Sequence, residues 1–123
     1  MSLLTILYIL NVTLLLLHEI ESAYEKEWEI LNLPGKITGF LLLHIPVILL
    51  ILYGLLEIAK ESFSGLLIGI IIGLGGLIPF AVHKIFIKRK EHFNKIISNI
   101  IIYLNILTGL CTVIFCAIAL FRT

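Results

Sequence analysis

The sequence predicts an all-α integral membrane protein, a four-helix up-down bundle in which residues 1–123 form a single transmembrane domain. Three observations lead to this fold class. The chain is 60% hydrophobic and has a mean hydropathy of +1.15, whereas soluble domains are about half apolar. Charged residues make up 14% of the chain, against roughly a quarter in soluble domains. The apolar residues also gather in four runs, each close to the ~20 residues that a helix needs to cross a bilayer.

Each apolar run is expected to be a helix, because backbone polar groups in lipid must be satisfied within the segment. The glutamate-rich stretch that begins at Glu19 is expected to prolong the first helix beyond the bilayer, until the turn at Asn32-Leu33-Pro34-Gly35. Ser62 is a candidate N-cap for the third helix. Short links should make sequential helices antiparallel neighbours. The four helices are expected at about residues 3–31, 37–58, 63–87 and 95–121.

The distribution of basic residues predicts the orientation. Two basic residues, Lys60 and Arg122, lie on the side of the second link and the termini. The first and third links carry Lys26, Lys36, Lys84, Lys88, Arg89, Lys90 and Lys95. The positive-inside rule therefore places these two links in the cytoplasm and both termini outside, as expected for a protein of the bacterial inner membrane. A net charge of +1 gives no basic field for nucleic acid, so the expected partner is the lipid bilayer.

The histidines converge in this topology. His18, His44 and His83 belong to three different helices and should lie at similar depths on the cytoplasmic side, while His92 lies in the third link. His44 stands inside an apolar run, between Leu43 and Ile45. An ionisable residue within a membrane segment indicates a functional site.

The first helix adds oxygen ligands to this group. His18 and Glu21 are three residues apart and share a helix face. Imidazole and carboxylate ligands suit Zn²⁺, Fe²⁺ or Mn²⁺. The sequence thus predicts a divalent metal as cofactor, held by His18, Glu21, His44 and His83. Glu25, one turn beyond Glu21, is the candidate catalytic general base, since a carboxylate beside an open coordination position can activate water.

Two asparagines should lie near the middle of the membrane. Asn11 and Asn105 are expected to hydrogen-bond to each other or to line one cavity, and His92 is a further candidate to line that cavity or to hydrogen-bond to the metal ligands. Two other interpretations remain open for this polar group. It can serve a polar substrate or a proton without any metal, or its members can be ordinary interfacial residues.

Glycines in the third segment predict close helix packing. Gly65, Gly69 and Gly73 recur every four residues, the small-xxx-small spacing that lets the backbones of membrane helices approach each other.

The motif that runs from His18 through Glu29, HEIESAYEKEWE, is followed by Leu33-Pro34-Gly35 and by FLLLH ending at His44. This arrangement resembles a small four-helix bacterial membrane family of unknown function with a HEIxSAYxKEW-type motif. It resembles more loosely the HXXEE-domain proteins, in which His18 and Glu21 match the motif and Ser22 stands at the position of its second glutamate. The resemblance implies a His/Glu site and no particular reaction.

The leading functional hypothesis is a membrane metalloprotein with a cytoplasm-facing site, acting as an enzyme on a lipid or another hydrophobic substrate. The first alternative is a small transporter or channel subunit, working as a homodimer and using the same polar site without metal. The second alternative is a structural subunit of a membrane complex, in which the helix face that carries Gly65, Gly69 and Gly73 would contact a partner.

Overall fold

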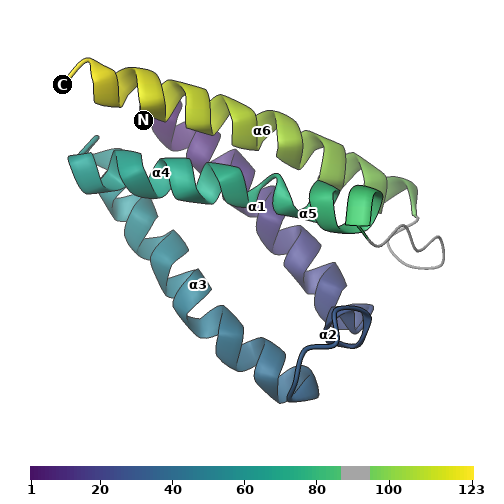
Figure 1. The fold of residues 1–123 in the computed structure, drawn as a ribbon. Helices are drawn as coiled ribbons and strands as arrows, with labels where there is room; N and C mark the ends of the chain where they lie inside the picture. The colour runs from purple at the N-terminus through teal and green to yellow at the C-terminus, as the bar shows by residue number, and fades with distance from the viewer. Residues whose placement is uncertain (87–94) are drawn as a thin grey trace.

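The computed structural model describes residues 1–86 and 95–123, and in this part of the chain every regular element is helical. The expected all-α four-helix bundle is confirmed (Figure 1). Among these residues, four spans are long and apolar enough to cross a membrane, Leu3–Tyr24, Lys36–Ala59, Phe63–Ile85 and Ile96–Phe121, which supports an integral membrane protein. The elements in order are α1 (Leu3–Tyr24), α2 (Glu27–Ile30), α3 (Lys36–Ala59), α4 (Phe63–Gly75), α5 (Ile78–Phe80), the π-helix η1 (Ala81–Phe86) and α6 (Ile96–Phe121).

Three of the long helices lie together, and the fourth diverges from them. In Figure 1, α1, α4 and α6 lie close together, whereas α3 joins α4 at one end and leans away toward the end that carries α2. A hydrophobic core cluster lies at the end of the bundle where α3 joins α4. Its residues Tyr8, Ile58 and Leu66 are almost completely buried. The hydroxyl of Tyr8 donates to the carbonyl oxygen of Ile51 at 2.8 Å, which links α1 to α3 inside the core.

The glycines of α4 lie at helix contacts. A methyl group on Gly69 would lie 2.6 Å from Sγ of Cys116 in α6, and one on Gly73 would lie 2.9 Å from the carbonyl oxygen of Gly109. Gly65 approaches the backbone of Glu57 at the end of α3. Side chains at these positions would separate the helices, because the observed backbone spacing leaves no room for a Cβ.

The first helix ends earlier than residue 31. After α1 ends at Tyr24, Lys26 adopts a left-handed conformation with φ of 53°, and the short helix α2 begins. This turn brings Trp28 against Phe40 of α3, with ring centroids 5.7 Å apart, and leaves Trp28 7% exposed. Burial of this large apolar ring against Phe40 favours the turn.

The third span is also interrupted. Helix α4 ends at Gly75, α5 contains Pro79, and the π-helix η1 follows at once. Proline has no N–H to donate to the preceding turn, so regular α-helical hydrogen bonding cannot continue through this point. Wide π turns are frequent at functional sites. The interruption matters because η1 carries His83.

A polar contact crosses the middle of the bundle. The amide nitrogen of Asn11 donates to the carbonyl oxygen of Ile72 at 3.0 Å, and its Oδ1 accepts a hydrogen bond from Thr108 at 3.1 Å. Asn105 is fully buried nearby, and a methyl group on Gly76 would contact Oδ1 of both asparagines. The hydrogen bonds of Asn11 therefore connect α1 to α4 and α6.

Candidate functional site

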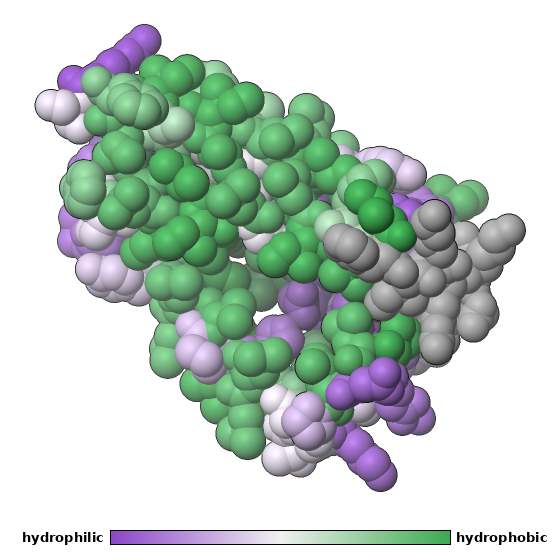
Figure 2. Space-filling view, viewed as in Figure 1, coloured by the Kyte–Doolittle hydropathy of each residue, from purple (hydrophilic) through white to green (hydrophobic). Residues whose placement is uncertain are grey.

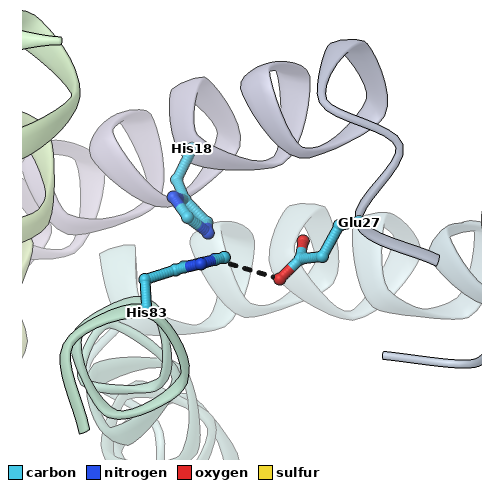
Figure 3. Close-up of side chains that lie close together, drawn as sticks. All are labelled: His18, Glu27 and His83. Carbon is cyan, nitrogen blue, oxygen red and sulfur yellow. Dashed lines mark hydrogen bonds and ion pairs between the residues drawn. The ribbon is translucent and has the colours of Figure 1, made fainter. Parts of the chain in front are cut away.

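A cluster of two histidines and one glutamate lies where α1, α2 and η1 meet. His18 comes from the last turns of α1, Glu27 begins α2, and His83 lies in η1. Figure 3 shows the His18 imidazole pointing toward the His83 ring at a tilt, with the Glu27 carboxylate beside His83. His18 lies six residues before the end of α1, about 9 Å along the helix axis. The cluster is thus near one end of the bundle rather than at its middle.

The geometry of this cluster fits metal coordination. One ligand atom from each of His18, Glu27 and His83 can be chosen so that all three lie within 4.8 Å of one another. His83 Nε2 and Glu27 Oε1 are 3.1 Å apart, and the two imidazole centroids are 5.0 Å apart. Ligand atoms of a tetrahedral zinc site lie about 3.3 Å apart, given metal–nitrogen distances of ~2.0–2.1 Å. Modest side-chain rotations would therefore bring the three ligands onto one ion.

The three side chains are shielded from solvent. His18 is 3% exposed, and Glu27 and His83 are each 8% exposed. Burial by itself raises the pKa of the Glu27 carboxyl, but the hydrogen bond with His83 and the charges of His83 and His18 outweigh burial and lower that pKa below its usual value. Glu27 is consequently held as a carboxylate, the form that binds a cation.

A second polar pair lies close to the cluster. His44 Nε2 and Glu19 Oε2 are 2.7 Å apart, and His44 Nδ1 lies 2.7 Å from the carbonyl oxygen of Phe40. The side chains of His44 and Glu19 are 16% and 26% exposed. The pair links α1 to α3 at the end of the bundle where these helices diverge.

The structure separates the four ligands predicted from the sequence into three groups. His18 and His83 belong to the cluster, and His44 pairs with Glu19 instead. Glu21 accepts a hydrogen bond from the hydroxyl of Ser98 in α6.

The other predicted site residues lie at different places around this end of the bundle. Glu25 is the C-cap of α1, and its backbone N–H donates to the carbonyl oxygen of Glu21 at 2.8 Å. Asn11 and Asn105 lie in the middle of the bundle, and His92 lies outside the described residues.

Sequence reasoning missed both Glu27 and Glu19 as site residues. In a continuous helix, Glu27 would lie nine residues after His18 and so on the opposite face. The left-handed turn at Lys26 reverses this expectation, and no glycine, proline or asparagine marks that turn. The nearest signal is that Glu19 and Glu27 both belong to the glutamate-rich stretch.

Two cavities adjoin these groups. The larger, of about 320 Å³, lies between α1, α3 and α4, and its wall includes Glu19 and His44 among apolar residues. The smaller, of about 180 Å³, shares Glu19, His44 and Ile78 with it and extends to Glu27 and Trp28. Figure 2 shows this side of the molecule as a largely hydrophobic face with a hollow, at the bottom of which hydrophilic residues are visible.

Comparison with known proteins gives a family. The model of a family of unknown function (DUF6713) matches residues 4–119, which include the whole His18–Glu27–His83 cluster and its surroundings. No curated protein and no solved structure matches the chain.

Proposed function

The chain belongs to this family of unknown function, and from its buried histidine–glutamate cluster we propose that it is a membrane protein that binds one divalent metal ion through His18, Glu27 and His83. The observation that carries the proposal is the convergence of these three ligands from three separate elements. Two imidazoles and a carboxylate form the ligand set of several catalytic zinc sites, which keep a fourth position for water or substrate. Zn²⁺ is the ion that this set suits best, and Fe²⁺ and Mn²⁺ are alternatives.

The position of the cluster supports a role in chemistry on a hydrophobic substrate. A metal with an open position polarises a carbonyl or phosphoryl oxygen and lowers the pKa of bound water. Glu27 lines the smaller cavity, which adjoins the larger apolar one through the His44–Glu19 pair. A substrate could therefore reach the ion from the lipid-facing side. Glu25 stays the general base predicted from the sequence, and Glu19, which lines both cavities, is a second candidate for moving a proton there.

The basic residues support an assignment of the site to the cytoplasmic side of a bacterial inner membrane. His18, Glu27 and His83 lie at the end of the bundle formed by the first and third links, which carry most of the lysines and arginines.

A second function remains in competition, a substrate or proton site without metal, such as a transporter subunit would need. The observation in its favour is that Glu27 and Glu19 already pair with His83 and His44 at 3.1 Å and 2.7 Å. Buried or half-buried His–Glu pairs of this kind occur in proton relays within membranes.

Elemental analysis separates the two functions. The protein is purified in detergent without chelator, supplied with zinc, and freed of unbound metal before its metal content is measured. We expect near-stoichiometric zinc in wild type and a loss of about 10²–10³-fold in affinity in Glu27→Gln and His83→Ala, since structural zinc sites derive about 3–4 kcal/mol from each of four ligands.

His44→Ala and Glu21→Gln are the matched controls, because they remove the same side-chain types a short distance away. Both should retain the metal, and circular dichroism should show wild-type helicity in all variants. Absence of metal from wild type would refute the proposal and favour the metal-free site. If His44→Ala lost the metal and Glu27→Gln kept it, the ion would have to be assigned to the ligands predicted from the sequence instead.

A further inference from the structure

The larger cavity has the shape and chemistry of a site for a chain-like molecule. Its volume of about 320 Å³ is at the lower end of the ~300–1,000 Å³ typical of small-molecule pockets. Aliphatic side chains of α1, α3 and α4 form its walls, among them Leu15, Val47, Ile48 and Ile72. Within the part of the chain that the structure describes, Glu19 and His44 are the only ionisable residues that line it. An apolar body with polar groups in one place is suited to an amphiphile rather than to an ion or a polar metabolite.

The geometry of His44 determines what the polar pair offers. The carbonyl oxygen of Phe40 can only accept, so His44 Nδ1 must carry the proton in that 2.7 Å contact. The 2.7 Å contact between Nε2 and Glu19 Oε2 then needs one further proton between them, since two acceptors would repel each other. Whichever atom holds this proton, the pair has no net charge. It therefore offers hydrogen bonds to a head group and no attraction for an anion.

The adjoining smaller cavity strengthens this conclusion. Among the described residues that line it, the ionisable ones are Glu19, Glu27 and His44, and none is a lysine or an arginine. A phosphate or carboxylate head group would need basic partners. A hydroxyl group can donate to a lone pair of the Glu19 carboxyl group that the contact with His44 leaves open, so it matches what these walls present.

We propose that the cavity between α1, α3 and α4 binds a single-chain amphiphile with an uncharged hydroxyl head group, the chain lying along the apolar wall and the hydroxyl at the Glu19–His44 pair. This names the class of molecule that would meet the proposed metal site, because the shared wall at Glu19, His44 and Ile78 leads on to Glu27. Binding itself rests on the cavity and the pair and does not require the ion.

Trp28 is a built-in reporter of this binding. It is the single tryptophan of the chain, and it lines the smaller cavity next to Glu27. The probe is 2-bromohexadecan-1-ol, whose bromine next to the head group quenches indole fluorescence at short range. We expect saturable quenching in mild detergent that unlabelled hexadecanol reverses, whereas hexadecanoate at pH 8 and hexadecane do not.

Two pairs of variants test the position of the amphiphile. Val47→Phe places a larger side chain in the wall of the cavity and should weaken binding tenfold or more, whereas Leu49→Phe, at a position 61% exposed on the same helix, should leave it unchanged. Glu19→Gln should weaken binding of the alcohol about tenfold, the equivalent of one hydrogen bond to a charged group. Glu57→Gln, at the other end of α3, should have no effect on it.

The outcomes distinguish this inference from the metal proposal. The amphiphile proposal would be overturned if the probe quenched Val47→Phe and Leu49→Phe equally. It would also be overturned if hexadecane displaced the probe as well as hexadecanol does. No saturable quenching in protein that retains stoichiometric zinc would overturn this inference alone. Saturable, cavity-dependent quenching in wild-type protein that binds no zinc would overturn the metal proposal alone.

Discussion

The crossing of α4 and α6 gives a sharp prediction, because two glycines of the same helix differ in their surroundings. A Cβ added at Gly73 would lie 2.8 Å from Val113 Cγ2, 2.9 Å from the Gly109 carbonyl oxygen and 3.2 Å from the Val113 nitrogen. A Cβ added at Gly75 would meet only Leu15 Cδ2, at 3.8 Å. The same substitution to alanine should therefore have opposite effects two residues apart.

The magnitudes follow from these distances. Non-bonded carbon atoms prefer ~3.5–4.0 Å, so Gly73→Ala creates overlaps of about 0.7 Å, and two of the three contacts are to the main chain of α6. Overpacking of this kind costs about 1–3 kcal/mol, and rigid main-chain contacts favour the upper part of that range. Alanine regains about 0.5–1 kcal/mol of helix propensity, which leaves a net loss of about 2 kcal/mol. Gly75→Ala meets no clash and should gain about 0.5–1 kcal/mol.

The assay is reversible unfolding of both variants by SDS in mixed micelles, followed by far-ultraviolet circular dichroism. The two free energies of unfolding should differ by about 3 kcal/mol, which is more than a hundredfold in the unfolding equilibrium. A Gly73→Ala variant as stable as wild type would refute the reasoning, because it would mean that the helices can separate at this crossing without cost.

Two further outcomes are expected. Ser62→Ala should reduce the free energy of unfolding by about 1 kcal/mol in the same SDS titration, because the Ser62 hydroxyl accepts from the Gly65 N–H at 3.0 Å as the N-cap of α4, and an unchanged midpoint would contradict that role. Zinc should dissociate as the pH is lowered from 7 toward 5, because protons compete with the metal for the imidazole nitrogens of His18 and His83, while the lowered pKa of Glu27 keeps its carboxylate ionised over that range. Equilibrium dialysis at each pH measures the bound zinc. Zinc retained at pH 5 and lost near pH 4 would mean that protonation of the Glu27 carboxylate, rather than of the imidazoles, releases the metal.

The amino-acid sequence by itself determined the fold class. Four apolar runs of membrane-spanning length leave helices as the spanning form, and the structure has the corresponding spans. Ser62 at the start of α4 could also be predicted, because N-capping depends on a side chain and a backbone three residues apart. The up-down order of the four helices was enough to predict that polar residues of different helices lie near one end of the bundle.

The composition of the candidate site was decided by the tertiary structure. The turn at Lys26 brings Glu27 back toward His18. Burial of Trp28 against Phe40 offsets the unfavourable left-handed conformation of Lys26, and this is a contact between residues of two different helices. The interruption around Pro79 could be suspected from the sequence, but the π-helical turn that presents His83 to Glu27 depends on packing around it. His44 illustrates the same limit, since its partner Glu19 is adjacent to His18 in sequence but points to α3. The periodicity of a sequence indicates which residues share one helix face. A site assembled from α1, α2 and η1 depends instead on where the helices end and on the angles between them. Long-range packing determines both of these features.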